Sequence, residues 1–380
     1  MPNLLYVTNT AGAKMAINYS GTAIGAAHRL GYNFHAVANR SLASKEQIQQ
    51  DEATYNVRLH HAEICRSPFS FKNLTAYKQV LSLIKNEDID FIHCNTPVGG
   101  MIGRLAGKKC KVKKIIYQVH GFHFYKGAPL FNRTVLKWAE KLMARLTDAI
   151  ITINSEDFET AKKFRLRNNG KVYFVHGVGI TLSDFEGISE KRDEKRAELN
   201  LSDTDVALIS AGDLNKNKNN AAIIRAIASL NNPKIKYFLC GVGPEKEALE
   251  TLSKQLGISD QVIFLGYRND IKLLYAAADV FVMPSFREGL SRSMMEAMAS
   301  GLPCVASEIR GNVDLIENGK NGYLCPATDD SAFSKSIENL ADSPELRLKI
   351  SKENLEKIKQ YDVSVVEKEI KAIYEEVLKA

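Results

Sequence analysis

Two carboxylates are the first residues whose type and spacing could do chemistry. The stretch "FREGLSRSMMEAMASG" holds Glu288 and Glu296, with seven residues between them. "VFVMPS" just before it has the pattern of a strand, and "SRSMMEAMAS" has the pattern of a helix. Glu288 would then lie in the strand-to-helix turn, where the backbone amides of Gly289 and Leu290 would attract a phosphate at the helix start.

Each of these carboxylates also has a purely structural interpretation. Ser293 and Glu296 have the spacing of a capping box, in which the glutamate only bonds back to the start of the helix. Glu288, in a turn beside a glycine, could simply be solvated. Deeper in the helix, Glu296 could instead accept hydrogen bonds from a sugar diol. The spacing alone leaves these alternatives open.

Cations follow another predicted strand, "VALISAG". The segment "GDLNKNKNN" begins at Gly212 and carries Lys216 and Lys218. Cations placed on a departing phosphate group stabilise the charge that it gathers and so lower the barrier to its departure. The alternative is a solvated turn of asparagine and lysine.

Polar residues also follow strands in the first half of the chain. Gly12 and Lys14 come after the first strand, Asn95 after "DFIHC" and His120 after "IIYQV". Ligands of open parallel sheets bind beyond the carboxyl ends of the strands, so these positions are candidates for a site. A histidine there could hydrogen-bond a sugar or carry a proton, because its ordinary pKa lies near neutrality; a structural role in the turn is the alternative for His120.

The elements that would position these residues alternate between short apolar runs and amphipathic stretches, which predicts parallel strands joined by helices. A chain of 380 residues is long for one core. The strand pattern restarts after the charged stretch "EGISEKRDEK", so we expect α/β domains at 1–185 and 186–360. Residues 361–380 keep apolar side chains at helical spacing and predict one more helix. Site residues from both domains would meet in the cleft between them.

The composition is that of a soluble globular protein, with 45% hydrophobic and 25% charged residues. No apolar run approaches the ~20 residues of a membrane span, and the chain does not begin like a signal peptide. We therefore expect a cytoplasmic protein. Six cysteines without a CxxC spacing indicate neither a zinc site nor a disulfide framework. The net charge of +7 favours an anionic partner.

The run "FREGLSRSMMEAMASGLPCVASEIRGNVDLIENGKNGYLC" resembles the signature of glycosyltransferase family four. "GVGPEKEAL", "VIFLGY", "AIITINS" and "VHGVGI" are similar to further family segments, so that the likeness covers nearly the whole chain. The resemblance implies an α/β protein of the GT-B class, with two Rossmann-like domains facing across a cleft and a C-terminal helix that crosses back to the first. It also implies a retaining transferase. The acidic triplet "DID" at residues 88–90 precedes a strand, at the wrong end for a site, so we expect no metal, and no cofactor besides the UDP-sugar substrate.

The resemblance assigns roles in binding a nucleotide sugar to the second domain. Glu288 would contact the donor sugar hydroxyls, Glu296 the ribose, and the amides of Gly289 and Leu290 the diphosphate. In the family a G-R-L-x-x-x-K segment supplies the cations. Here Lys218 matches the lysine and Gly212 the glycine, while Asp213 stands in place of the arginine and Lys216 is its candidate replacement.

The block "HGFHFYKGAP" is similar to one subgroup, bacterial enzymes that build capsular polysaccharide, exopolysaccharide and lipid-linked oligosaccharides. That likeness implies transfer of an N-acetylated sugar from UDP to an undecaprenyl-diphosphate-linked acceptor, with His120 beside the donor. The first domain would hold the acceptor, and its candidate acceptor-binding residues are Gly12, Lys14, Asn95, Lys126 and Arg133.

A basic helix in the same domain points to a membrane. The segment Met101–Arg145 holds eleven Lys or Arg residues and one acidic residue, Glu140. In "FNRTVLKWAEKLMARL" four cations recur every four residues beside an apolar stripe. The cations are Arg133, Lys137, Lys141 and Arg145, and the stripe is Phe131, Val135, Trp138 and Leu142. Such a helix could lie on an anionic bilayer and place the protein on the inner face of the plasma membrane. The alternative is an ordinary crossover helix with its apolar side on the sheet.

Two other classes of function compete with the transferase. A GT-B relative could act on UDP-sugars without an acceptor, as a 2-epimerase does. A non-enzymatic basic module could bind a membrane. Nucleic-acid binding lacks support, because no recognised motif or aromatic stacking platform accompanies the charge.

Overall fold

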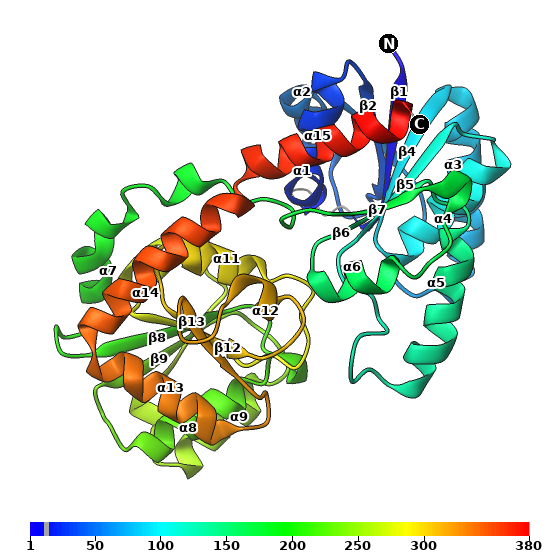
Figure 1. Ribbon diagram of the computed structural model, residues 1–380. Helices are drawn as coiled ribbons and strands as arrows, with labels where there is room; N and C mark the ends of the chain where they lie inside the picture. The colour runs from blue at the N-terminus through cyan, green and yellow to red at the C-terminus, as the bar shows by residue number, and fades with distance from the viewer. Residues whose placement is uncertain (11–14, 380) are drawn as a thin grey trace. The chain divides into compact units, whose positions relative to one another are not determined.

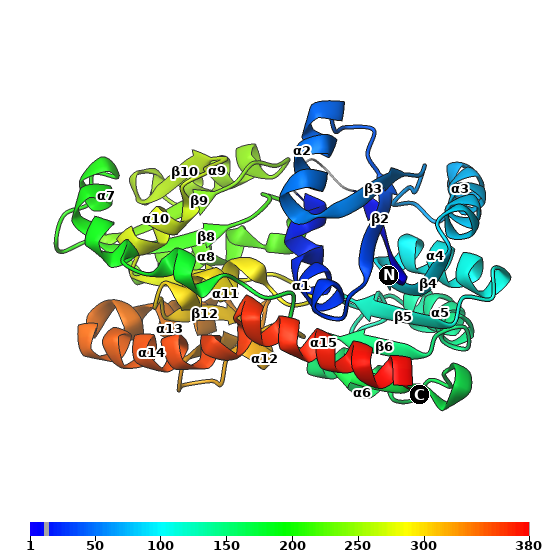
Figure 2. The same ribbon diagram turned by 90° about the horizontal axis from the view of Figure 1, so that it is seen from above.

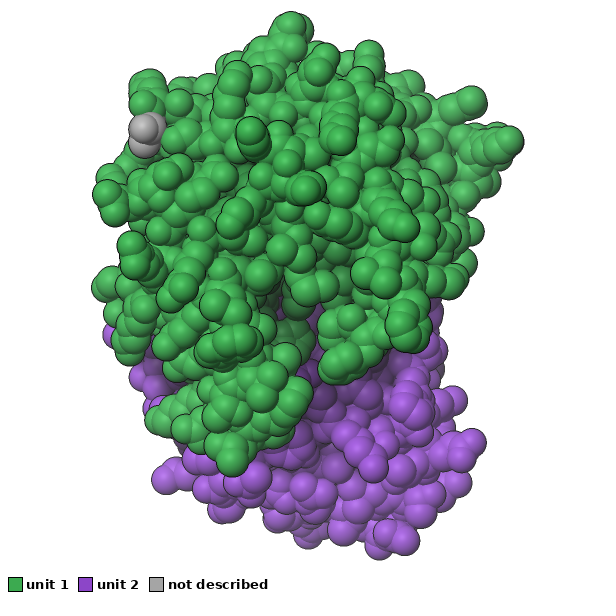
Figure 3. All heavy atoms as spheres, turned by 90° about the vertical axis from the view of Figure 1, so that its right-hand side faces the viewer, with its two compact units in different colours: residues 1–179, 363–380 green, residues 180–362 purple. Residues whose placement is uncertain are grey.

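The computed structural model describes residues 1–10 and 15–379. The chain forms two compact units (Figure 3): unit 1 comprises residues 1–179 and 363–380, and unit 2 comprises residues 180–362. The chain enters unit 2 a few residues before the charged stretch used to place the expected boundary. Phe185 shows why, because its buried ring packs in the core of unit 2.

Unit 1 alternates strands and helices along the chain (Figure 1). Its strands are β1 Asn3–Thr10, β2 Asn33–Asn39, β3 Val57–His61, β4 Ile89–Asn95, β5 Lys114–Val119, β6 Ala149–Thr152 and β7 Lys171–Phe174. Its helices are α1 Met15–Arg29, α2 Lys45–Tyr55, α3 Lys72–Asn86, α4 Pro97–Lys109, α5 Lys137–Ala144, α6 Ser155–Ala161 and α15 Val363–Lys379, with a π-helical turn, η1, at Asn132–Leu136.

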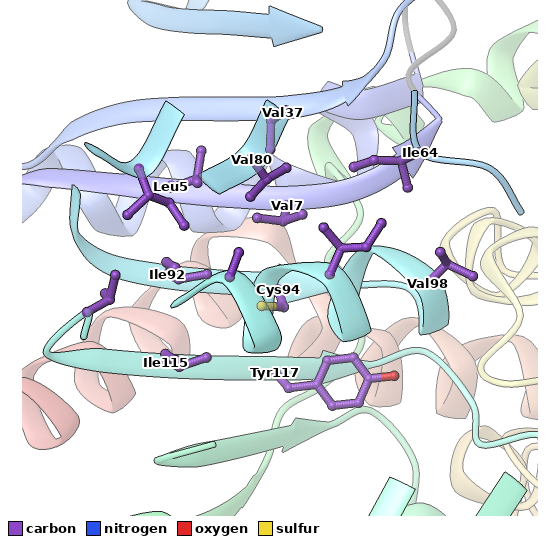
Figure 4. Packing of buried hydrophobic residues seen from close by; sticks show 14 of the residues in the cluster. Leu5, Val7, Val37, Ile64, Val80, Ile92, Cys94, Val98, Ile115 and Tyr117 are labelled. Carbon is purple, nitrogen blue, oxygen red and sulfur yellow. The ribbon is translucent and has the colours of Figure 1, made fainter. Parts of the chain in front are cut away.

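The strands of unit 1 form one parallel sheet in the order β3-β2-β1-β4-β5-β6-β7. Alternate side chains of a strand point to opposite faces of its sheet. Leu5 and Val7 of β1 therefore face α3 and α4, together with Ile92 of β4 and Ile115 of β5 (Figure 4). Tyr6, between them, faces the other side.

The C-terminal helix α15 covers that other face of the unit 1 sheet. It lies alongside α1 (Figures 1 and 2), and its apolar positions are buried as their spacing predicts. Tyr374 of α15 packs edge-on against Phe91 and His93 of β4. The expected return of the last helix to the first domain is confirmed.

Unit 2 repeats the alternation. Its strands are β8 Val206–Ala211, β9 Ile235–Cys240, β10 Val262–Gly266, β11 Val280–Met283, β12 Cys304–Ser307 and β13 Gly322–Cys325. Its helices are α7 Arg192–Glu198, α8 Asn220–Leu230, α9 Lys246–Gln255, α10 Ile271–Ala277, α11 Arg292–Ala299, α12 Asn312–Leu315, α13 Asp330–Asp342 and α14 Pro344–Lys357, with a 3-10 turn, η5, at Lys216–Lys218.

The strands of unit 2 pair in parallel in the order β10-β9-β8-β11-β12-β13. One face of the sheet packs against α10 and α11, and the other against α8, α9 and α13. Ile209 and Leu208, neighbours in β8, accordingly belong to two different cores. Two parallel α/β sheets confirm the expected fold class. Among the described residues, no helix combines the length and the hydropathy that crossing a bilayer requires.

Candidate functional site

The carboxyl edge of the unit 2 sheet brings together a cation and a carboxylate from two loops. Lys218 follows β8, and Glu288 follows β11. Their side chains form an ion pair, with Lys218 Nζ 2.8 Å from Glu288 Oε1. Both are largely shielded, with side-chain exposures of 22% and 16%. The lysine and the glutamate that the sequence assigns to one site are therefore in direct contact.

Glycine makes room for this lysine. Gly212 has a φ of +148°, and a Cβ added there would lie 3.2 Å from Cε of Lys218. At the next strand, a Cβ on Gly241 would lie only 1.9 Å from the carbonyl oxygen of Gly212. The ends of β8 and β9 can approach each other because both positions lack a side chain. The space left at Gly212 accommodates the aliphatic part of the Lys218 side chain at the end of β8.

Two asparagines flank Lys218 and fasten its segment to neighbouring loops. Asn217 donates its side-chain amide to the carbonyl of Arg287 at 2.9 Å, and its own carbonyl accepts the amide of Phe286 at 2.8 Å. Asn219 donates to the carbonyl oxygens of Pro284 at 3.1 Å and Ala327 at 2.8 Å. Asn219 therefore joins the loops that follow β8, β11 and β13. Sequence reasoning assigned no role to either asparagine, although the run "NKNKNN" directly after a strand marks them.

Helix α11 begins beside Glu288 with a serine cap. Ser291 accepts a hydrogen bond from the amide of Met294 at 3.3 Å. Glu296 accepts instead from Arg292 Nε at 2.9 Å. The capping-box interpretation of Ser293 and Glu296 is therefore wrong, because the helix starts earlier and Glu296 lies in its second turn. Glu296 is 16% exposed and remains a prediction for the ribose contact.

Arg310 is a further residue at this edge that sequence reasoning missed. It follows β12 and is buried, and its Nε donates to the backbone carbonyl of Glu288 at 3.2 Å. The turn at Gly311 packs directly against Gly289, since a Cβ on Gly311 would be 2.2 Å from the carbonyl oxygen of Gly289. The loop after β12 thus supports the turn that carries Glu288 and the two backbone amides predicted to hold a diphosphate, those of Gly289 and Leu290.

A shallow recess marks the same edge of unit 2. Residues that line it include Ser210, Gly212, Lys218, Asn220, Pro284 and Ser285. The Ser285 hydroxyl is fully buried, and within the described structure it has no hydrogen-bond partner. Lys216 is exposed nearby on η5, so it is accessible to a ligand, and whether it replaces the family arginine stays a prediction.

Unit 1 places His120 and Asn95 at the carboxyl edge of its own sheet. His120 directly follows β5, and burial lowers its pKa to about 4. Such a ring is neutral near pH 7 and can donate or accept a hydrogen bond, while its lowered pKa disfavours taking up a proton. Asn95 ends β4 and is buried, with its carboxamide bonded to the Tyr6 hydroxyl and to the amide of Thr96 at 2.7 Å. In this structure Asn95 holds the strand end in place.

The start of α4 is strained at this point. Thr96 has a φ of 63°, a value that costs a β-branched residue on the order of 1–3 kcal/mol. The Asn9 side-chain oxygen stabilises the turn, because it accepts from Thr96 Oγ1 at 2.8 Å and from the amide of Gly99 at 2.7 Å. The helix start is therefore held rigidly beside Asn95.

The other predicted acceptor residues lie on the surface or outside the described residues. Lys126 is exposed in the loop after β5, where its amide donates to Glu156 Oε1 at 2.8 Å. Arg133 is exposed on η1. Gly12 and Lys14 fall within residues 11–14, which the structure does not describe.

The basic helix exposes three of the four residues of its apolar stripe, and the fourth, Leu142, is half-buried. Phe131 is 54%, Val135 47% and Trp138 63% exposed, and the helix buries only Ala144. The alternative of an ordinary helix with its apolar side on the sheet is therefore wrong. The segment starts with the π-helical turn η1, and α5 continues it from Lys137.

One basic residue of that region is internal. Arg104 is buried, binds both carboxylate oxygens of Glu140 and stacks over the Tyr117 ring at 3.9 Å. The one acid in the basic segment is therefore neutralised inside the unit. Lys141 on α5 and Arg145 directly after it are exposed beside the apolar residues.

Family models match both units. The model described as "Glycosyl transferases group 1" matches residues 191–357, and "Glycosyl transferase 4-like" matches residues 24–154. A Bacillus subtilis (strain 168) protein, provisionally named glycosyltransferase EpsD, is 34% identical over 91% of this chain and 90% of its own length. The chain belongs to the group 1 glycosyltransferases. It is thus a transferase enzyme, and a purely non-enzymatic binding module is excluded.

Two further relatives of this glycosyltransferase are named for their activities. The Escherichia coli UDP-Gal:alpha-D-GlcNAc-diphosphoundecaprenol alpha-1,3-galactosyltransferase is 28% identical, over 75% of each chain. The Campylobacter jejuni N,N'-diacetylbacillosaminyl-diphospho-undecaprenol alpha-1,3-N-acetylgalactosaminyltransferase is 28% identical, over 87% of this chain and 90% of its own.

A solved structure shares the whole fold of this glycosyltransferase. HepE from Anabaena, in complex with UDP, matches with a TM-score of 0.80 and 18% identity over 99% of this chain and 100% of that chain. The GT-B class expected from the resemblance is confirmed.

Proposed function

We propose that this glycosyltransferase moves a sugar, of the N-acetylated hexosamine type, from a UDP-sugar to a polyprenyl-diphosphate-linked sugar in surface polysaccharide biosynthesis. The observation that carries the proposal is the ion pair of Lys218 and Glu288 at the carboxyl edge of unit 2. The activities for which the Escherichia coli and Campylobacter jejuni relatives are named support the choice of donor and acceptor classes.

On the donor side, Lys218 would bind the diphosphate and Glu288 the sugar hydroxyls. Without a ligand the two groups neutralise each other across 2.8 Å. A diphosphate, with its higher charge, would compete for the lysine and release the carboxylate to accept hydrogen bonds from the sugar. The amides of Gly289 and Leu290 would add donors beside the start of α11. Binding of donor therefore rearranges an ion pair that already exists.

In the transfer step, the bond from the anomeric carbon to the phosphate oxygen breaks and a bond to the acceptor hydroxyl oxygen forms. Attack from the face that the diphosphate leaves keeps the anomeric configuration. The acceptor proton passes to the departing phosphate, and Lys218 stabilises the negative charge that gathers there. Glu288 recognises and positions the sugar in this scheme and is not a glycosidase-type acid or base.

We further propose that unit 1 holds the acceptor on the inner face of the plasma membrane. The exposed stripe of Phe131, Val135 and Trp138, flanked by Lys141 and Arg145, has the chemistry of a segment that lies on an anionic bilayer. A polyprenyl-linked acceptor lies in that bilayer. The contact would bring the enzyme to the plane in which its second substrate moves.

The experiment is to offer the purified enzyme a panel of UDP-sugars together with undecaprenyl-diphosphate sugars and to follow products by mass. We expect one UDP-sugar to add its sugar mass to the acceptor and release UDP. A donor sugar that changes without an acceptor would instead identify a 2-epimerase. Absence of any product with every donor, while UDP itself fails to bind, would overturn the proposal.

A further inference from the structure

We propose that the segment 66–74, between β3 and α3, is a second anionic-membrane contact of unit 1. It is separate in sequence from the η1–α5 segment. This inference rests on the proposed function, because it assumes an acceptor that is carried in a lipid surface. It adds a part of the chain to which neither the motifs nor the relatives assign a role.

The segment displays large apolar side chains almost completely to solvent. Phe69 is 83% and Phe71 is 87% exposed, and Leu74, in the first turn of α3, is 64% exposed. A phenylalanine side chain left in water forgoes the burial free energy that it would gain in an apolar phase. Two neighbouring rings exposed to this degree project from the surface. They are therefore better suited to insertion into a lipid bilayer than to covering a groove of the protein.

The backbone that carries these rings is held in one conformation. Asn73 is buried, its side-chain oxygen accepts from the amide of Cys65 at 2.9 Å, and its side-chain amide donates to the carbonyl of Ser67 at 2.8 Å. The amide of Ser70 donates to the carbonyl of Ser67 at 3.3 Å. Since the loop is fixed by its own hydrogen bonds, inserting its rings costs little conformational entropy.

The charge around the rings complements an anionic surface. Four basic side chains and no acidic one lie between Glu63 and Glu87. They are Arg66, Lys72, Lys78 and Lys85. Glu63 itself is paired, with its Oε2 3.3 Å from Lys72 Nζ. Exposed apolar groups surrounded by cations are the combination that partitions into the headgroup region of anionic bilayers.

The topology places the segment at the same sheet edge as the first contact. All strands of unit 1 are parallel, so the segment after β3 and the segment after β5 both leave the carboxyl edge. Four strand-to-strand steps separate β3 from β5 in the order β3-β2-β1-β4-β5, which is roughly 19 Å at a spacing of about 4.8 Å. Two contacts carried by different segments of this edge would fix the orientation of unit 1 on a surface, which one helix cannot do.

The test uses tryptophan fluorescence, because Trp138 is the only tryptophan of the chain. A Trp138→Phe, Phe69→Trp variant carries its sole tryptophan on the 66–74 segment. With phosphatidylglycerol vesicles we expect its emission to shift to the blue and to be quenched by lipids brominated on the acyl chain. Unchanged emission, or the same response with phosphatidylcholine vesicles alone, would overturn the proposal.

A second measurement keeps Trp138 and removes the rings. Phe69→Ser with Phe71→Ser should weaken sedimentation with phosphatidylglycerol vesicles by about 10-fold or more. Leu74→Ser should weaken it by roughly 3-fold. The matched control is Leu348→Ser, on α14 of unit 2, where the leucine is 59% exposed, and it should bind like wild type. Equal binding by all these variants would overturn the second contact.

The proposed transferase activity is read separately, with the acceptor dissolved in detergent. The ring variants should keep wild-type transfer there, because they do not touch the donor edge. If transfer is retained while vesicle binding is unaffected by the ring variants, the second contact fails and the proposed function stands. Loss of transfer from every UDP-sugar in the wild-type enzyme would defeat the proposed function itself.

Discussion

The two sheets of the molecule share one architecture but end in different chemistry. At the carboxyl edge of unit 2, short polar loops are fastened to one another and display Lys218 against Glu288. At the carboxyl edge of unit 1, buried Asn95 bonds to Tyr6, and the segments that follow β3 and β5 expose Phe71 and Trp138. The first edge suits a small, highly charged, soluble ligand, and the second suits a ligand presented at a lipid surface. Under the proposed function, the same fold would serve two substrates through the segments that follow its strands.

The largest effect should come from the cation of unit 2. Lys218→Ala should lower kcat by roughly 10²- to 10³-fold, because its charge acts on the departing diphosphate, and should leave binding of free uridine nearly unchanged. Steady-state kinetics of sugar transfer give kcat, and titration with uridine gives the affinity for the free nucleoside. Lys234→Ala, an exposed lysine before β9, is the control and should behave as wild type. Equal losses of turnover and of uridine binding would count against the assigned role.

The carboxylate of the pair should come next. Glu288→Gln keeps the shape and removes the charge, so it should lower kcat/KM by roughly 10- to 100-fold. Glu308→Gln, exposed in the loop after β12, provides the matched control. Activity of Glu288→Gln or Glu288→Ala within about threefold of wild type would show that the pair is structural only.

The basic side chains of unit 1 should affect binding to the membrane and not the transfer reaction. Lys137→Gln with Lys141→Gln should weaken binding to phosphatidylglycerol vesicles by roughly 30-fold, at ~1 kcal/mol for each charge. Lys335→Gln with Lys349→Gln, exposed on unit 2, removes the same charge elsewhere. Sedimentation with vesicles compares the two pairs. Equal weakening by both pairs would mean that net charge alone, without the helix, attracts the membrane.

Lowering the pH should affect the stability of the two units differently, because all eight histidines lie in unit 1. Burial lowers the pKa of His93 to about 3 and, with His60 adding, that of His35 to about 4. The unfolded chain takes up these protons near pH 6.5, before the folded unit does, so unit 1 loses stability as pH falls from about 6.5 toward 4.

The free energy of unfolding of unit 1 should fall by roughly 2 kcal/mol at pH 5 for each fully buried histidine ring such as His93. Urea unfolding followed by pulsed hydrogen exchange on peptides of each unit measures it, and His93→Gln should flatten the slope for unit 1. Unit 2 has no histidine and should change little between pH 6.5 and 5, because its carboxylates with a lowered pKa, such as Asp270 and Glu198, lose their contribution only at lower pH. Equal acid sensitivity of both units would contradict the assignment.

The smallest effect should come from the asparagine that joins three loops of unit 2. Asn219 has a φ of 51°, so Asn219→Gly removes the side-chain hydrogen bonds without straining the backbone. We expect kcat/KM to fall by roughly 5-fold, mostly through kcat, as Lys218 loses its position. Asn231→Gly, at the far end of α8 with a φ of 48°, is the control. Equal kinetics of the two variants would leave Asn219 a structural role only.

Sequence patterns predicted most of the strands of both sheets, because buried parallel strands are nearly continuous apolar runs. They did not predict β3 and β13, which lie at the edges of their sheets. β3, "VRLHH", buries only Val57, so neighbours along the chain give it no apolar periodicity. A strand of this kind is determined by pairing with β2, which is a contact between distant residues.

The candidate site was predictable to the extent that strand ends mark it. The Lys218–Glu288 pair could be expected from the two motifs, but the contact itself joins residues 70 apart in the sequence. Arg310 and Asn219 were missed, since each acts through backbone carbonyls of another loop. The exposure of Trp138 was equally unpredictable, because an amphipathic stripe does not show whether a sheet covers it.

The most direct test of the central claim is calorimetric titration of the wild-type enzyme and of Lys218→Ala with uridine, UMP and UDP. If unit 2 holds a diphosphate between Lys218 and the start of α11, affinity should rise from uridine to UDP in the wild type, and the variant should lose most of that gain. Equal affinity for all three ligands, or an undiminished preference for UDP in Lys218→Ala, would contradict the account.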